Sequence, residues 1–184
     1  MSQIKTLFKN VSWVALTQVI INICAFIWTI LITRYLGVND YGILSFAISF
    51  TVLLGIGADI GMSTFSTREI SKDRERAQKF INNLIPFKIV LSISLFLLTA
   101  ILLVLIGYSK LVIEVTLIMS IETLFIAMIN FIGGIFQAHE NQSYTSIGAM
   151  IYSILLVLFT LIIIFLDWGI IAIALSYALS YLIY

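Results

Sequence analysis

The feature that most constrains this chain is a single polar stretch, Ser66 to Asn83, set between long apolar runs. Five of the ten Lys and Arg residues fall within it. The chain is 61% hydrophobic and 10% charged, whereas a soluble domain carries about 25% charged residues. A soluble fold cannot hide this much apolar surface, because even a domain of about 150 residues buries only about 70% of its unfolded area. The sequence therefore predicts an all-α integral membrane protein.

The apolar runs have the length of membrane-spanning helices, for which about 20 residues suffice. We expect about six spans, covering residues 11–33, 43–63, 86–106, 111–136, 144–166 and 170–184. The polar stretch, at 66–83, is expected to form an amphipathic helix along the inner membrane surface. The sixth span is incomplete, because the sequence stops at Tyr184 without a polar flank. We therefore expect a piece of a longer protein.

The basic residues predict the orientation in the membrane. Translocation of Lys and Arg is opposed, so the polar stretch is assigned to the cytoplasm and the N-terminus lies on the same side. Lys88, just beyond the stretch, is expected to extend to the inner interface. Only Arg34 and Lys110 then lie outside, against eight basic residues inside: Lys5, Lys9, Arg68, Lys72, Arg74, Arg76, Lys79 and Lys88. This bias predicts a multi-pass plasma membrane protein with a cytoplasmic N-terminus.

The first span carries a polar stripe. Gln18, Asn22, Thr29 and Thr33 fall within about 60° of one another at 100° per residue. A polar stripe on a spanning helix should face protein or water rather than lipid. It serves either as hydrogen-bonding contact between helices or as the lining of a cavity, and the sequence leaves both open.

Two acids lie within the expected spans. Glu122 is well inside the fourth span and Asp59 is in the inner third of the second. An ionisable group within the bilayer is a functional candidate that needs a partner or a watery cavity. Asp59 fits equally well as a helix-end carboxylate that reaches the cytoplasmic headgroups. Asn130 lies roughly 80° around the helix from Glu122, so the two are expected to border one polar face.

Other functional classes find little support. The chain has one histidine, His139, and one cysteine, Cys24, so neither a metal site nor a disulfide framework is expected. We expect no cofactor. The basic residues gather beside membrane spans, which argues against nucleic-acid binding. An intramembrane enzyme needs paired acid–base or nucleophilic groups at one depth, and Glu122 has no such companion; we expect no enzymatic activity.

Several short motifs resemble one family. Arg34-Tyr35-Leu36-Gly37 followed by Asp40-Tyr41-Gly42 resembles the turn after the first helix of polysaccharide biosynthesis exporters. These are the O-antigen and lipid-linked oligosaccharide flippases of the multidrug/oligosaccharidyl-lipid/polysaccharide exporter superfamily. The stretch from Asp59-Ile60-Gly61 to Thr67-Arg68-Glu69-Ile70, the polar stretch, and Phe136-Gln137-Ala138-His139-Glu140-Asn141 look like the same family. Val38 departs from it, since the family often has proline there, which affects only the rigidity of the turn.

The resemblance implies an architecture and an activity. Family members have two six-helix lobes around a central cavity, so this chain would be the N-terminal lobe, completed by a C-terminal lobe or a second copy. The implied partners are membrane lipids and a polyprenyl-pyrophosphate-linked oligosaccharide. The oligosaccharide is carried from the inner to the outer leaflet by alternating access, without chemistry on the substrate. Such exporters are driven by ion or proton gradients or by the membrane potential.

The residue types suggest roles within this implied activity. Amides and hydroxyls suit sugars, and fixed positive charge suits pyrophosphate. The substrate-path candidates are Gln18, Asn22, Thr29, Asn130, Arg34 at the outer mouth and Arg68 at the inner mouth. The candidates for ion or proton coupling are Asp59 and Glu122, because a buried carboxylate binds protons more readily. Two alternatives remain: a multidrug antiporter of the same superfamily, and a membrane scaffold for polysaccharide synthesis that transports nothing.

Overall fold

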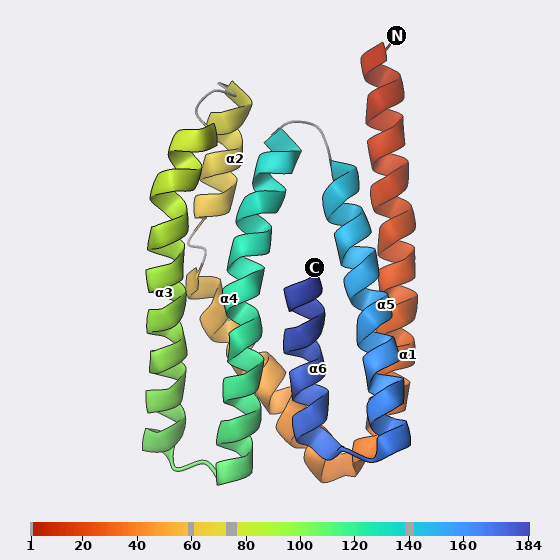
Figure 1. The fold of residues 1–184 in the computed structure, drawn as a ribbon, viewed down its shortest axis with the longest axis vertical. Coiled ribbons are helices and arrows are strands. Elements are labelled where there is room, and N and C mark those ends of the chain that lie inside the picture. Colours follow the sequence, from red (N-terminus) through yellow and green to blue (C-terminus); the bar gives the residue numbers. More distant parts are fainter. Residues whose placement is uncertain (1, 59–60, 73–76, 139–141) are drawn as a thin grey trace.

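The computed structural model describes residues 2–58, 61–72, 77–138 and 142–184, and all regular structure in these residues is helical. The elements, shown in Figure 1, are α1 (Ser2–Gly55), the 3-10 helix η1 (Ile56–Ala58), α2 (Met62–Lys72), α3 (Ala77–Ile106), α4 (Lys110–Ala138), α5 (Gln142–Leu166) and α6 (Gly169–Ile183). The predicted all-α class is confirmed.

Helix α1 reverses its direction at Gly37. This glycine lies inside the helix with φ 69° and ψ −176°, a conformation that residues with a Cβ rarely adopt. In Figure 1 the first leg of α1 runs down the bundle and the second leg returns diagonally across it. The turn expected around residues 34–42 is thus a sharp kink at one glycine. The apolar part of α1, Ser12–Gly55, has 44 residues, about twice the length that one crossing needs.

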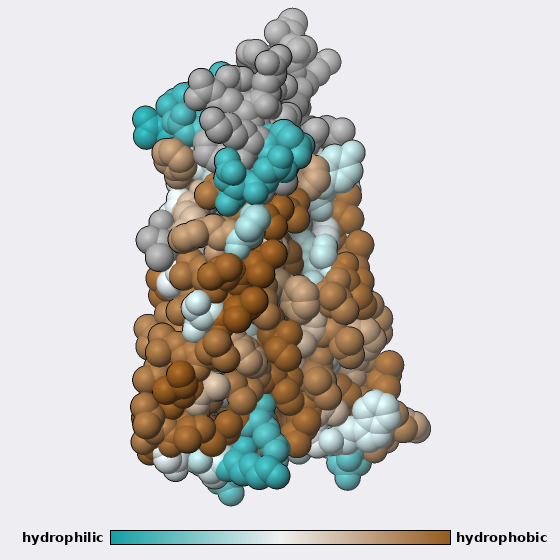
Figure 2. All heavy atoms as spheres, turned by 60° about the vertical axis from the view of Figure 1, so that its left-hand side comes forward, coloured by the Kyte–Doolittle hydropathy of each residue, from teal (hydrophilic) through white to brown (hydrophobic). Residues whose placement is uncertain are grey.

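Three further helices have the length and composition of membrane spans. They contain the apolar segments Asn82–Ile106, Lys110–Gln137 and Ser143–Leu166, whereas α6 has only 15 residues. Many large apolar side chains on these helices are exposed, and Figure 2 shows a hydrophobic belt between hydrophilic groups at the two ends of the molecule. Such a surface is suited to lipid. The chain is a membrane protein.

One end of the bundle is tightly packed. We call it the packed end; it carries the Gly37 kink, the turn at Gly107 and the turn at Asp167–Gly169. Its apolar core joins both legs of α1 to α4, α5 and α6. The core residues are Trp28, Ile32, Leu44, Ala47, Val115, Met119, Leu156, Ile163, Ile170, Ile173 and Ala174.

Hydrogen bonds between distant segments hold the packed end together. The Trp28 indole donates to the Thr160 hydroxyl at 3.1 Å. The Tyr35 hydroxyl donates to the Asp167 carboxylate and accepts from the backbone N–H of Gly169, both at 2.9 Å. Tyr35 therefore ties the kink in α1 to the turn between α5 and α6.

The opposite end, which we call the polar end, carries the N-terminus and α2 (Figure 1). Here the stretch 66–83 is divided between the end of α2 and the start of α3. Helix α2 packs against α4 and buries Ser63, Ser66 and Ile70. Lys88 does not extend to the interface as expected, because its side chain is fully buried between helices.

Candidate functional site

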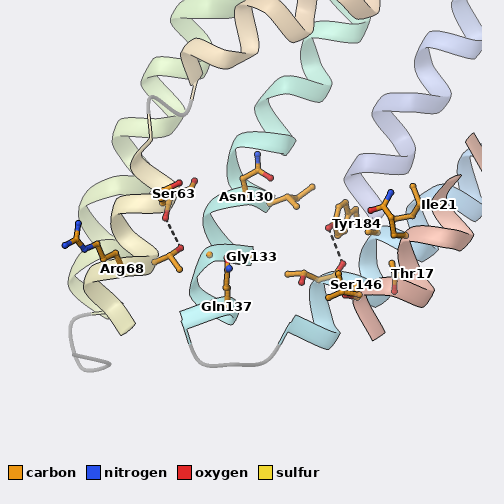
Figure 3. A pocket seen from close by; sticks show the side chains of 17 residues that line it. Thr17, Ile21, Ser63, Arg68, Asn130, Gly133, Gln137, Ser146 and Tyr184 are labelled. Carbon is orange, nitrogen blue, oxygen red and sulfur yellow. Dashed lines mark hydrogen bonds between the residues drawn. The ribbon is translucent and has the colours of Figure 1, made fainter. Parts of the chain in front are cut away.

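A cavity of about 690 Å³ occupies the polar end, bounded by the first leg of α1, by α2, α4 and α5, and by Tyr184. Figure 3 shows how these elements surround it. Its polar lining residues are Thr17, Gln18, Ser63, Thr64, Thr67, Arg68, Asn130, Gln137, Thr145, Ser146 and Tyr184. The lining is rich in hydroxyl and amide groups, which donate and accept hydrogen bonds without carrying charge.

Three of the residues predicted from the sequence meet at this cavity. Gln18 comes from α1, Arg68 from α2 and Asn130 from α4. The Gln18 amide donates to the Asn22 side-chain oxygen at 3.0 Å. In Figure 3 the Arg68 guanidinium extends outward from α2, away from Gly133. The charged end of Arg68 therefore points away from the α4 wall of the cavity.

The rest of the α1 stripe lies elsewhere. Asn22, Thr29 and Thr33 are exposed, as is Arg34 just beyond the stripe, and none of the four lines any of three cavities in the described part of the chain. The Thr29 hydroxyl donates to the Ala25 carbonyl of its own helix at 2.8 Å. The face of α1 toward the cavity carries Val14, Thr17, Gln18 and Ile21, and it shares only Gln18 with the stripe. Arg34 lies beside the Gly37 kink at the packed end.

Two glycines allow close contacts with residues that line the cavity, Thr67 and Tyr184. A side chain at Gly134 would collide with the Thr67 hydroxyl of α2, and one at Gly148 would collide with the Tyr184 ring. Thr67 in turn donates to the Ser63 carbonyl at 2.8 Å, as Figure 3 shows. Neither glycine was predicted from the sequence as a site residue. Small residues where spanning helices meet were the signal that could have identified them.

The buried Lys88 was also missed as a site residue. Its ammonium group donates to the hydroxyl of Ser63, a cavity-lining residue, at 3.2 Å. It also lies 5.7 Å from the centre of the Phe131 ring, which is within the range of a cation–π interaction. A positive charge therefore stands directly behind the cavity wall.

Glu122 lines a separate cavity of about 150 Å³ with Thr51, Thr123 and Asn130. Asn130 lines both cavities, and it shares the smaller one with Glu122. Tyr181 of α6 lies close to the Glu122 carboxylate. Asp59, the other predicted acid, lies outside the described residues.

A third cavity, of about 260 Å³, lies between α4, α5 and α6 and shares lining residues with the polar cavity of about 690 Å³. It is lined largely by aromatic and aliphatic side chains, with Phe125, Phe136, Tyr144, Tyr181 and Tyr184 supplying the rings. Within the described residues, no three His, Cys, Asp or Glu side chains lie close enough together to hold a metal ion.

Comparison with known protein families identifies the family of this chain. A family model described as polysaccharide biosynthesis protein matches residues 7–184, nearly the whole sequence. The chain belongs to this family. Neither a curated protein nor a solved structure matches it. Family membership and the apolar helices together make it a multi-pass membrane protein of polysaccharide biosynthesis and export.

Proposed function

We propose that the protein carries a polyprenyl-pyrophosphate-linked oligosaccharide from the inner to the outer leaflet, without chemistry on it. The observation that carries this proposal is the polar cavity among apolar helices. Uncharged amides and hydroxyls replace the hydration of sugar groups, and a lipid-soluble bundle surrounds them. Family membership supports a lipid-linked substrate.

The proposal assigns the polar end to the cytoplasm. This assignment follows from the positive charges near α2 and the N-terminus. The chain then exposes its cavity to the inner leaflet, where the substrate is loaded, and keeps the outer side shut by the packed end. Alternating access would require the packed end to open, with a second lobe completing the path. A second lobe would be either a further part of the protein or another copy of this chain.

Within this proposal, Gln18 and Asn130 bind sugar hydroxyls. Arg68 and the buried Lys88 supply positive potential for the pyrophosphate. Glu122 couples transport to an ion or proton, because a carboxylate within a membrane-length helix responds to a cation more strongly than one in water. Asn22, Thr29 and Arg34 lie away from the cavity in this state of the molecule, so a role in the path requires another conformation.

Translocation in liposomes tests the proposal. The full-length protein is reconstituted with a fluorescent polyprenyl-pyrophosphate oligosaccharide, and an external quencher reports which leaflet holds the label. We expect the parent protein to equilibrate the label between leaflets. Gln18→Leu and Asn130→Leu should each slow this by about tenfold, because one lost hydrogen bond to the substrate is worth about 1.4 kcal/mol.

The chain offers a matched control. Gln78 forms the same kind of bond as Gln18, from its amide to the Asn82 side-chain oxygen at 3.0 Å, but it is exposed and lines none of the three cavities. Gln78→Leu should leave translocation unchanged. If both cavity variants translocate the label at the rate of the parent, the cavity does not bind the substrate during transport. If the parent itself does not translocate the label, the transport proposal is refuted.

The aromatic cavity favours one second candidate, a multidrug antiporter. Aromatic faces bind flat cationic drugs through cation–π contacts, and five rings line this cavity. Efflux of ethidium from cells that express the full-length protein separates the two functions. Ethidium efflux without oligosaccharide translocation would support the antiporter.

A further inference from the structure

The α-helix of the second membrane crossing is interrupted before it reaches the polar end. The second leg of α1 ends at Gly55, η1 covers Ile56–Ala58, and α2 begins at Met62. Gly61, directly before α2, has φ 74°, a conformation that glycine adopts without the strain that a Cβ would bring. A stretch of 3-10 helix within a longer helix often marks a hinge. Helix α2 is therefore a separate element that can turn relative to α1.

The side-chain hydroxyls of α2 form hydrogen bonds within the helix itself. The Ser66 hydroxyl donates to the Met62 carbonyl at 2.7 Å. The Thr67 hydroxyl donates to the Ser63 carbonyl at 2.8 Å. These bonds stay intact if α2 moves as a whole. Of the three residues that α2 buries, only Ile70 is apolar, so little apolar area opposes a separation of α2 from its neighbours.

Helix α2 also forms one wall of the polar cavity, which it lines with Ser63, Thr64, Thr67 and Arg68. It packs against α4, where Thr67 occupies the space that a side chain at Gly134 would fill. Figure 3 shows the α2 residues and the α4 residues as neighbouring parts of the lining. A separation of α2 from α4 would therefore widen the cavity on this side.

The same separation would uncover a positive charge. The Lys88 side chain is fully buried, and its ammonium group donates to the hydroxyl of Ser63 on α2 at 3.2 Å. Lys88 itself does not line the polar cavity, whereas Ser63 does. An ammonium group binds a phosphate through direct, charge-assisted hydrogen bonds. In the observed arrangement Ser63 lies between Lys88 and the cavity, so Lys88 can reach a substrate only if α2 moves aside.

We propose that α2 is a gate helix. It separates from α4 by turning about the interruption before it, widens the polar cavity and exposes Lys88 to the pyrophosphate of the substrate. The gate deepens the proposed function, on which it rests for its role, by naming the movement that lets Lys88 contact the substrate.

Thiol labelling tests the movement without any transport. Ser66 is 1% exposed, so the thiol of Ser66→Cys is protected while α2 is packed against its neighbours. The purified full-length protein, with Cys24→Ala, is treated with a charged methanethiosulfonate. We expect Ser66→Cys to react at least about tenfold faster than Ser120→Cys, at a serine of α4 that is 2% exposed. Ser71→Cys, at an exposed position of α2, sets the upper limit. Equal rates for Ser66→Cys and Ser120→Cys would overturn the gate.

A disulfide between α2 and α4 tests whether transport needs the movement. A Cβ at Gly134 would lie 3.8 Å from the Thr67 Cβ, within the range of about 3.5–4.5 Å that a disulfide requires. The protein with Thr67→Cys, Gly134→Cys and Cys24→Ala is oxidised, and mass spectrometry confirms the disulfide. We expect it to translocate the oligosaccharide at least about tenfold more slowly than the same protein after treatment with dithiothreitol. A disulfide that does not form would contradict the contact on which the gate rests.

Gly55 and Thr123 offer a matched disulfide on the other side of the interruption. A Cβ at Gly55 would lie 3.9 Å from the Thr123 Cβ, so Gly55→Cys with Thr123→Cys joins α1, rather than α2, to α4. Each pair is compared with its own reduced form, which removes the effect of the substitutions themselves. Oxidation should change the rate of this second pair by less than about twofold. If oxidation slows both pairs equally, or slows neither, the gate is refuted.

The two measurements separate this inference from the proposed function. If the parent translocates no oligosaccharide but Ser66→Cys reacts as expected, the movement of α2 stands and its transport role fails. If the parent translocates and the oxidised protein with Thr67→Cys and Gly134→Cys keeps the rate of its reduced form, transport stands and the gate is refuted.

Discussion

The two ends of the bundle are built from different side chains. At the packed end, aliphatic residues from both legs of α1 and from α4, α5 and α6 form one core, and Trp28 and Tyr35 add hydrogen bonds to distant parts of the chain. At the polar end, hydroxyls, amides and glycines line a cavity of about 690 Å³. Helices α1, α4 and α5 contribute to both ends. The difference indicates that the packed end stabilises the fold. The polar end is packed less densely and leaves a cavity lined by polar groups.

The largest expected effect is at the packed end. Trp28→Ala removes an almost fully buried ring, its bond to Thr160 and its edge contact with Tyr177. We expect the free energy of unfolding to fall by about 3 kcal/mol, measured by denaturant titration in mixed micelles. Trp13, which is 36% exposed near the polar end, is the control, and Trp13→Ala should cost less than about 1 kcal/mol. Equal losses of unfolding free energy in Trp28→Ala and Trp13→Ala would contradict the conclusion that the packed end supplies the stability.

The next effect tests the close approach of helices at the polar end. Gly134→Ala places a methyl group against the Thr67 hydroxyl, so either the Thr67 side chain must rotate and lose its bond to the Ser63 carbonyl, or α2 must move from α4. Overpacking of this kind costs about 1–3 kcal/mol, and the same titration measures it. Adding Thr67→Ala should recover most of the loss, because it removes the colliding oxygen. Gly42→Ala, where a new methyl group meets nothing within 4 Å, should not destabilise the protein. A double variant no better than Gly134→Ala would argue against this contact.

Tyr35→Phe tests the bond between the kink and the α5–α6 turn. It removes the donor to Asp167 and the acceptor for the Gly169 N–H, and we expect a loss of about 1–2 kcal/mol. Hydrogen exchange should also quicken at residues 167–169. Tyr108, an exposed tyrosine of the same end, serves as the control. If exchange stays slow in Tyr35→Phe, the turn does not depend on this hydroxyl.

The smallest effect concerns the surface of the packed end. Lys110 and Glu114 form an exposed ion pair of 3.5 Å, and exposed pairs of this kind contribute about 0.5 kcal/mol or less. Lys110→Met should therefore change the free energy of unfolding by no more than this amount, and the change should shrink further in high salt. A loss as large as that of Trp28→Ala would show that surface charge, rather than the core, stabilises this end.

The sequence by itself determined the membrane class, the helical structure and the family, because long apolar runs and short motifs are local properties of a chain. It also placed Glu122 and Asn130 on neighbouring parts of one helix surface, since a helix repeat of 3.6 residues fixes the angle between two side chains; both line the same cavity. It could not show that Gln18 faces the cavity while Asn22 and Thr29 do not. That division depends on which neighbours α1 packs against.

Only the tertiary structure decided which distant segments contact one another. The turn motif beginning at Arg34 could be recognised, but only the folded chain shows that Tyr35 ties it to Gly169, which is 134 residues away. The burial of Lys88 over Phe131 overrode the local expectation that a lysine near a span end reaches water. Tyr181, which lies close to Glu122, comes from α6, and no pattern within α4 predicts it. Contacts between segments distant in sequence have no local signature, because they arise only when the helices pack together.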